Sequence, residues 1–257
     1  MNLAIVTLSA EGATVGGKLA AELADCRLYV HDSAQCQIEA ERFDSIAVLT
    51  QELFRCCRKL VYVAPCGVVV RAIAPLLCHK TSDPAVVAVD AGGRYAISLL
   101  SGHEGGANAL ALEVANVLGA EPVISTTTEA VKNLIVGIGC RRGATAERIG
   151  AAIRAALCKV GATEDQVRFL SSASIKRGEA GLIQAAGELG LSLRFISCEE
   201  ILSTTKRFQH SPFVAEKVKL PAVAEPSALL AGRRTRLILP KTIINGVTIA
   251  IARENCL

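Results

Sequence analysis

Short apolar runs alternate with amphipathic stretches along the chain. The run at residues 3–8 is rich in β-branched side chains and predicts a buried strand, and residues 13–24 carry apolar positions at helical spacing. Further strands are expected at 60–63, 86–89, 96–100 and 122–125, with helices at 68–73 and 107–118. The first half of the chain therefore has the pattern of repeated strand–helix units.

The same alternation begins again after residue 133. Strands are expected at 134–136, 167–170, 193–196, 236–239 and 247–251, and helices at 145–160 and 181–189. Strands that alternate with helices are typical of α/β folds, in which helices cover a mainly parallel sheet. We therefore expect two α/β domains of the three-layer α/β/α type, at residues 1–133 and 134–257.

Composition narrows the choice of partner. Hydrophobic residues make up 51% of the 257 positions, but aromatic residues only 4%, and Trp is absent. The core must therefore be filled by aliphatic side chains. Proteins that bind single-stranded nucleic acid stack bases on aromatic rings, so this composition argues against a nucleic-acid partner.

Charge is divided unevenly between the two halves. Residues 1–133 carry 10 Lys and Arg against 14 Asp and Glu, a net charge of −4, whereas residues 134–257 carry 18 against 10, a net charge of +8. This asymmetry suggests that the second half meets an anionic partner. The alternative explanation of this asymmetry is chance variation among solvated side chains.

The ten cysteines form neither a metal-binding nor a disulfide pattern. No Cys-x-x-Cys pair is present, and the neighbours Cys78 and His79 stand alone, so we expect free thiols, no bound metal and a cytoplasmic location. The apolar stretch at residues 60–78 is interrupted by two prolines, a glycine and an arginine and predicts no membrane segment. The N-terminal apolar run lacks the basic residues of a signal peptide.

Three loops that join a predicted strand to a predicted helix carry polar residues. In the first, at residues 61–71, the strand runs through Pro65 and Gly67 into a helix that carries Arg71 one turn from its start. The free N–H groups at such a helix start can hold a carboxylate. An ordinary strand-to-helix turn would have the same sequence.

The second loop combines a histidine, a carboxylate and several glycines. Its candidate residues are Gly102, His103, Glu104, Gly105, Gly106 and Asn108. A carboxylate beside an imidazole can orient it for general acid–base catalysis, so we expect His103 to act as acid or base and Glu104 to orient it. The glycines would let a large ligand approach the backbone, although a capping loop also explains them.

The third loop, at residues 137–143, is not a dinucleotide-binding fingerprint because its last glycine comes one residue too late. Its adjacent residues Arg141 and Arg142 suit carboxylates, which arginine binds through two parallel hydrogen bonds. Three further charged residues lie at comparable edges and, taken singly, are typical of the solvated surface: Lys176, Glu179 and Glu225.

Taken together, these segments resemble one known family. Residues 69–75, 80–90, 92–95 and 98–108 are similar, in this order, to the N-terminal domain of the cobalt-precorrin-5A hydrolases, the CbiG proteins of cobalamin biosynthesis. Residues 137–143, Lys176, Glu179 and Glu225-Pro226 resemble the C-terminal domain of that family, which also occurs alone as the CobE-type protein.

The resemblance implies a hydrolase that opens the δ-lactone of cobalt-precorrin-5A and releases acetaldehyde. It implies a cobalt-containing tetrapyrrole with many carboxylate side chains as substrate, no cofactor besides the cobalt in that substrate, and other enzymes of the pathway as partners. For this reaction His103 and Glu104 are the candidate catalytic residues. The candidate substrate-binding residues are Arg71, Gly102, Gly105, Gly106, Asn108, Arg141, Arg142, Lys176, Glu179 and Glu225.

Two departures from the family pattern leave an alternative open. Most members carry a middle segment between the two domains, whereas here residues 126–132 pass directly into the loop at 137–143. Ser174 also stands where the family often has Asp. The alternative is a non-catalytic corrinoid-binding or chaperone protein of the same pathway, which would release no acetaldehyde.

Overall fold

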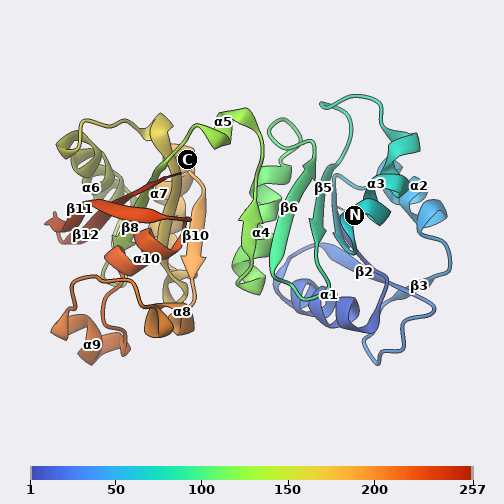
Figure 1. Cartoon of the computed structure of the whole chain (residues 1–257), viewed down its shortest axis with the longest axis horizontal. Helices are drawn as coiled ribbons and strands as arrows, with labels where there is room; N and C mark the ends of the chain where they lie inside the picture. Colours follow the sequence, from blue (N-terminus) through green and yellow to red (C-terminus); the bar gives the residue numbers. More distant parts are fainter. Residues whose placement is uncertain (1, 256–257) are drawn as a thin grey trace. The chain divides into compact units, whose positions relative to one another are not determined.

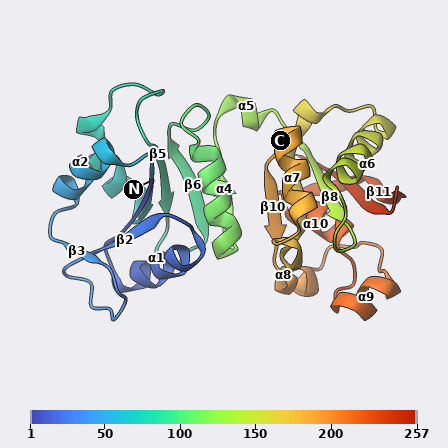
Figure 2. The ribbon, with the colours of Figure 1, turned by 180° about the vertical axis from the view of Figure 1, so that it is seen from behind.

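The apolar run near the N-terminus forms β1 (Leu3–Thr7), which is buried along its whole length. The structure, a computed structural model, describes residues 2–255 except for the side chain of Phe213, and it divides into two units between Thr126 and Thr127. Figures 1 and 2 show a sheet with helices on both faces in each unit. The predicted α/β class with mainly parallel sheets is therefore confirmed. The domain boundary at residue 133 stays a prediction.

The described part of the first unit contains one seven-stranded sheet in the order β3-β2-β1-β4-β5-β6-β7. Its other strands are β2 (Cys26–His31), β3 (Glu41–Phe43), β4 (Lys59–Val63), β5 (Ala85–Val89), β6 (Tyr95–Leu100) and β7 (Glu121–Val123). Neighbouring strands are parallel except for β5 and β6, which are antiparallel with Val86 opposite Leu100. The loop after β6 therefore lies at the edge where β5 begins, opposite the edge where β1, β4 and β5 end.

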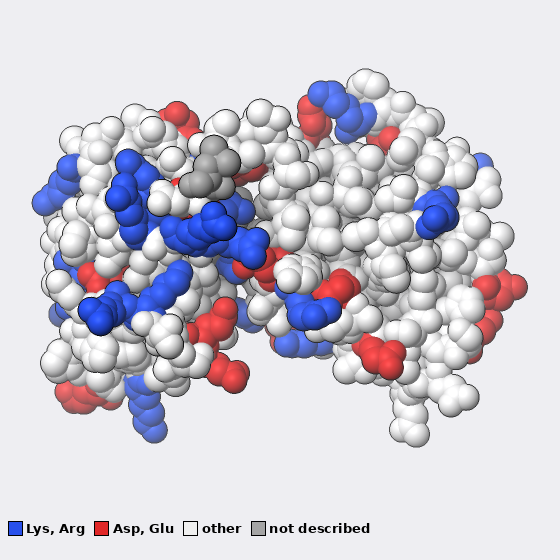
Figure 3. Space-filling model, viewed as in Figure 1, with Lys and Arg blue, Asp and Glu red and all other residues white. Residues whose placement is uncertain are grey.

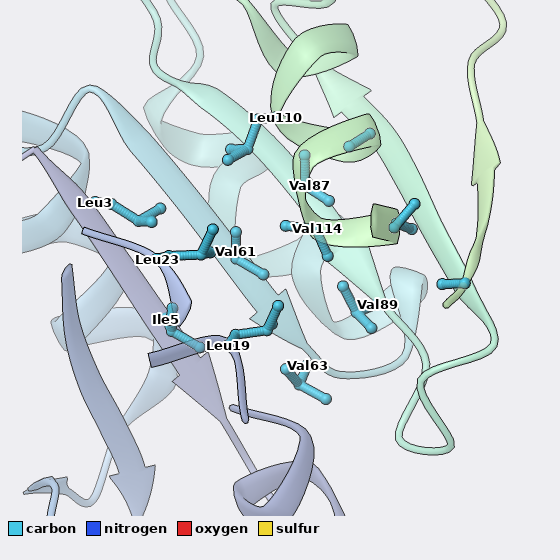
Figure 4. Packing of buried hydrophobic residues seen from close by; sticks show 14 of the residues in the cluster. Leu3, Ile5, Leu19, Leu23, Val61, Val63, Val87, Val89, Leu110 and Val114 are labelled. Atoms are coloured by element: carbon cyan, nitrogen blue, oxygen red, sulfur yellow. The ribbon is translucent and has the colours of Figure 1, made fainter. Parts of the chain in front are cut away.

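Helices cover both faces of this sheet. Those of the first unit are α1 (Ala10–Glu22), α2 (Ile46–Cys56), α3 (Cys66–Ile73), η1 (Ala74–Leu76) and α4 (Ala107–Leu118). On one face, Leu3 and Ile5 belong to one buried cluster with Leu19 of α1 and with Leu110 and Val114 of α4, and Figure 4 shows these residues. On the other face, alternate residues of the same strands pack with α2 and α3. The alternation of side chains along each strand therefore builds two aliphatic core layers.

The described part of the second unit contains a five-stranded sheet in the order β10-β9-β8-β12-β11. Its strands are β8 (Leu134–Gly139), β9 (Val167–Ala173), β10 (Leu193–Ile196), β11 (Thr235–Ile244) and β12 (Val247–Glu254). Strands β8, β9 and β10 are parallel, so the loops that follow them meet at one edge. Strand β12 is antiparallel to β8 and forms a hairpin with β11. Asn245 and Gly246 turn this hairpin with positive φ values of 50° and 77°, as a two-residue hairpin requires.

Two helices pack on one face of the second sheet and α10 packs on the other. The helical segments of this unit are α5 (Thr127–Ala130), α6 (Ala146–Lys159), η2 (Glu164–Gln166), η3 (Ser174–Lys176), α7 (Ala180–Leu189), α8 (Cys198–Ser203), α9 (Pro212–Val218) and α10 (Ala224–Leu230). Helices α6 and α7 cover Leu134, Val136 and Ile138. On the opposite face, a Cβ atom on Gly137 would lie 1.9 Å from the carbonyl oxygen of Ala224. Glycine at 137 therefore lets the backbone of α10 contact the sheet directly.

Candidate functional site

The histidine-containing loop, residues 101–106, joins β6 to α4 in the first unit. Ser101 fastens its start, because the hydroxyl donates to the carbonyl oxygen of Asp83 at 3.0 Å. Asp83 is 9% exposed, and its carboxylate accepts the N–H groups of Cys78 and His79 at 3.1–3.2 Å. The loop is thus joined to the segment that leads into β5. Asp83 lies in the stretch that resembles the family, although the sequence analysis did not single it out.

Glu104 is hydrogen-bonded to Lys80 and not to His103. Its carboxylate accepts a hydrogen bond from Lys80 at 2.7 Å, and this bond holds the pKa of Glu104 below its usual value. His103 is exposed, and within residues 2–255 its ring makes no hydrogen bond. The imidazole is therefore accessible to a ligand, and the carboxylate that was expected to orient it is hydrogen-bonded to Lys80.

The glycines of this loop pack against the protein itself. A Cβ atom on Gly105 would lie 2.4 Å from the Cβ atom of Ser101, and one on Gly102 would lie 2.8 Å from Thr126. Gly106 has a φ of +88°, which favours glycine at the start of α4. Gly102 and Gly105 are thus explained by close internal packing, without the ligand approach that the sequence analysis expected.

Asn108 connects the start of α4 to two other segments. Its side-chain oxygen accepts from Ser98 at 2.8 Å, and its amide group donates to Thr126 at 3.0 Å. Both polar ends of the side chain are therefore occupied by the protein.

Arg71 lies at the opposite edge of the first sheet from the histidine-containing loop. It is exposed in the second turn of the eight-residue helix α3, and it donates to the carbonyl oxygen of Gly67 at 3.1 Å. The turn from β4 into α3 lies where β4 ends, whereas residues 101–106 lie at the opposite edge. The structure therefore does not bring the first two candidate loops together.

In the second unit, the loops after β8 and β9 do meet. Glu179 is 9% exposed, and its carboxylate accepts the backbone N–H of Gly143 at 2.7 Å and the ammonium group of Lys176 at 3.1 Å. The exposed residues Arg141 and Arg142 precede Gly143 in the same loop. Glu179 therefore fixes the loop that presents the two arginines.

The electrostatics at Glu179 favour its charged form. Burial alone would raise the pKa of this carboxyl, but the Gly143 N–H and the charge of Lys176 outweigh burial and hold the pKa below its usual value. Cys140, next to Arg141, has the opposite tendency, since burial raises the pKa of its thiol. The charges in this loop cluster are thus carried by arginine, lysine and glutamate.

A third loop reaches the same edge of the second sheet. Ser174 follows β9 and Cys198 follows β10, and their side-chain oxygen and sulfur atoms lie 3.7 Å apart. Nothing in the sequence analysis marked Cys198, because the pairing of β9 with β10 that places it there cannot be read from residue spacing.

Glu225 is buried at 1% exposure and lies in the first turn of α10. Its two oxygens accept the backbone N–H groups of Gln209 at 2.6 Å and Lys241 at 2.7 Å. The expectation of solvated surface charges is therefore wrong for Glu225 and for Glu179. Both are buried carboxylates that hold backbone segments together, as buried charge requires.

Within residues 2–255, no three His, Cys, Asp or Glu side chains are grouped so that they could hold a metal ion. No helix in the same part of the chain combines the length and apolar character needed to cross a membrane.

Acid should weaken the contribution of Glu179 to folding. Because its pKa in the folded state is lowered from 4.5, its stabilising effect is complete above that pH and is lost as pH falls through the folded-state value. Glu179→Gln should therefore lower the free energy of unfolding by about 1–3 kcal/mol at neutral pH, and the difference from the parent should shrink in acid. Urea unfolding over a pH series measures this. Glu188→Gln, which changes an exposed carboxylate bonded to Gln184, should show no such pH dependence; a pH-independent deficit in Glu179→Gln would contradict the assignment.

Two parts of the chain match known protein families. Residues 48–129 match the family described as "Cobalamin synthesis G N-terminal" and residues 134–252 match "Cobalamin synthesis G C-terminus". A cobalt-precorrin-5A hydrolase of Salmonella typhimurium is 49% identical over 79 residues, which are 31% of this chain and 22% of that protein. The chain thus spans less than a quarter of that relative.

A second relative covers more of the chain. The cobalt-precorrin-5A hydrolase of Priestia megaterium is 26% identical over 306 positions, covering 81% of this chain and 82% of that protein. This alignment is longer than the whole chain of 257 residues, so the relative has residues without a counterpart here.

The crystal structure of CobE, a protein from the cobalamin biosynthetic pathway, is 31% identical in sequence with a TM-score of 0.44 and covers 48% of this chain and 91% of that one. The N-terminal and C-terminal family segments follow one another in the order expected from the sequence. Because residues 48–129 and 134–252 match the two family models, the chain belongs to the cobalamin synthesis G (CbiG) family.

Proposed function

We propose that this protein is a cobalt-precorrin-5A hydrolase that opens the δ-lactone of its substrate and releases acetaldehyde. The observation that carries the proposal is the presence of both family segments in one chain, together with curated relatives that bear this name. The substrate is then a cobalt-containing tetrapyrrole with carboxylate side chains, and the cobalt arrives with it.

The histidine-containing loop supplies the proton transfer in this proposal. Water attacks the lactone carbonyl, the imidazole of His103 takes its proton, and the acyl–oxygen bond breaks to give a carboxylic acid and an alkoxide. The alkoxide becomes the carbonyl group of acetaldehyde as its carbon–carbon bond to the ring breaks, and the electron pair of that bond passes to the macrocycle, which takes the proton from His103. Support comes from the exposure of the ring and from its lack of a hydrogen-bond partner within residues 2–255. Lys80 holds Glu104, so we assign Glu104 to keeping the loop in place beside Asp83 and Ser101.

The arginine-containing loop binds substrate in this proposal. Arg141 and Arg142 are exposed and carry two guanidinium groups on a loop fixed at Gly143, which suits recognition of carboxylates. Lys176 retains N–H donors beyond its bond to Glu179, because an ammonium group has three. Glu179 and Glu225 are then supporting residues, since their oxygens are already occupied and a polyanion would repel them.

The decisive experiment is incubation of the full chain with cobalt-precorrin-5A. The expected result is loss of a two-carbon fragment from the corrin, seen by mass spectrometry, with acetaldehyde in equal amount. Binding without any release would sink the enzyme assignment.

That outcome would favour the second candidate, a non-catalytic corrinoid-binding protein of the same pathway. One observation supports it, namely that the Priestia megaterium hydrolase has residues within the aligned region that this chain lacks. Binding of the corrin together with an absence of acetaldehyde distinguishes this candidate from the hydrolase.

Removal of both loop arginines should weaken binding of the anionic corrin. Arg141→Ala combined with Arg142→Ala is expected to cost about 2–4 kcal/mol of binding free energy if each makes a charge-assisted hydrogen bond. Equilibrium titration followed by corrin absorbance measures the change. Arg148→Ala, at an exposed arginine on α6, is the matched control and should change affinity little. Unchanged affinity in a folded double variant would refute the site assignment.

A further inference from the structure

A group of four arginines lies at the start of the β11–β12 hairpin, away from every loop considered above. Arg233 and Arg234 precede β11, and Arg236 is the second residue of that strand. Arg253 lies directly opposite Arg236 on β12. We term these four residues the arginine patch. Figure 3 shows lysine and arginine side chains gathered over the part of the second unit where β11 and β12 lie.

Among residues 2–255, no carboxylate forms an ion pair with a side chain of the arginine patch. Within residues 2–255, the side chains of all four arginines lack an ion pair or hydrogen bond, and the buried Nε atom of Arg253 has no acceptor. Glu254 follows Arg253 but is only 5% exposed. Its two oxygens are taken by the guanidinium of Arg168 and by the backbone N–H of Arg233.

The pairing of Arg236 with Arg253 is unfavourable for the protein alone. Residues directly opposite one another on antiparallel strands share a face of the sheet, and like charges at such positions destabilise the strand pair. An oxyanion bound between the two guanidinium groups would remove the repulsion. Guanidinium groups bind carboxylates and phosphates through two parallel hydrogen bonds.

The arginine patch is separate from the loop that carries Arg141 and Arg142. Arg253 lies opposite Leu134, at the start of β8, whereas that loop follows Gly139 at its end. At about 3.3 Å per residue, the two ends of β8 are roughly 17 Å apart. Helices cover both faces of the sheet between them.

We propose that the arginine patch is a second anion site, which binds a ligand with two or more carboxylate or phosphate groups. The patch binds such a ligand whether or not the protein opens a lactone, so this inference does not depend on the proposed function.

The test is calorimetric titration of the full chain with citrate and, separately, with pyrophosphate. Arg236→Gln combined with Arg253→Gln is expected to weaken binding of the better ligand at least about tenfold, equivalent to about 1.4 kcal/mol. Arg148→Gln removes an exposed arginine in the first turn of α6, which follows the end of β8, whereas the arginine patch lies where β8 begins; this variant should leave the affinity unchanged. Preference for citrate identifies a polycarboxylate site, and preference for pyrophosphate identifies a polyphosphate site.

A second measurement checks the premise without ligand. Removal of the like-charge pair should leave the Tm of the double variant equal to or above that of the parent. A lower Tm would contradict the repulsion, and equal affinity of variant and parent would overturn the site. The proposal also fails if Arg148→Gln loses as much affinity as the double variant, or if the parent binds neither citrate nor pyrophosphate at millimolar concentration.

Discussion

His103→Ala is expected to lower turnover about 10²–10⁴-fold while the substrate still binds, because general acid–base catalysis typically contributes this factor. The ring makes no hydrogen bond within residues 2–255, and the loop is fastened at Ser101 and Glu104, so its removal should leave the loop in place. Single-turnover release of acetaldehyde measures the chemical step, and corrin absorbance measures binding. Added imidazole should restore part of the rate.

His79→Ala provides the matched control. His79 is another exposed histidine, close in sequence to Lys80 and hydrogen-bonded to Thr81 at 2.8 Å, and we assign it no part in the reaction. It should turn over at the parent rate. If His103→Ala also does so, or if it fails only because it no longer binds, His103 is a ligand contact and the proton must be transferred by another group.

Glu225→Ala is expected to lower the free energy of unfolding by roughly 2–6 kcal/mol. The substitution leaves the N–H groups of Gln209 and Lys241 without their acceptor, and each unsatisfied buried group costs about 1–3 kcal/mol. Urea denaturation measures the loss. Glu225→Gln keeps one acceptor oxygen and should lose less, while Glu216→Ala, at an exposed carboxylate in the same unit, should change stability by less than about 0.5 kcal/mol.

The outcome at Glu225 separates two roles that its sequence leaves open. If Glu225→Ala folds with the stability of the parent but no longer binds the corrin, the residue contacts substrate, as the resemblance to the family suggested. If the variant is less stable but its folded fraction still binds the corrin, the role of Glu225 is to hold α10 to the segments that contain Gln209 and Lys241.

The sequence predicts strands best where they are buried on both faces. Strand β1 and strand β5 are continuous aliphatic runs, and both appear close to their expected bounds. Strand β2 was missed because Arg27 and His31 interrupt its apolar pattern. Helix α10 was missed because it contains Pro226. Proline is tolerated there because the N–H groups in the first turn of a helix have no acceptor within the helix, so none is lost.

The position of the histidine-containing loop could have been predicted more closely. Only a short turn separates β5 from β6, in which Asp90 accepts the N–H groups of Arg94 and Tyr95, and a short turn of this kind joins antiparallel strands. That signal places the loop after β6 at the opposite edge from the turn after β4. The burial of Glu179 could not be predicted, because it depends on Gly143, which is distant in sequence.

The contact between Glu179 and Gly143 also bears on how this loop can change during evolution. The bond is made to the main chain of Gly143, so it constrains the length of the loop more than the side chains of Arg141 and Arg142. Substitutions at positions 141 and 142 therefore leave the bond between Glu179 and Gly143 intact, whereas an insertion or deletion in the loop would displace it.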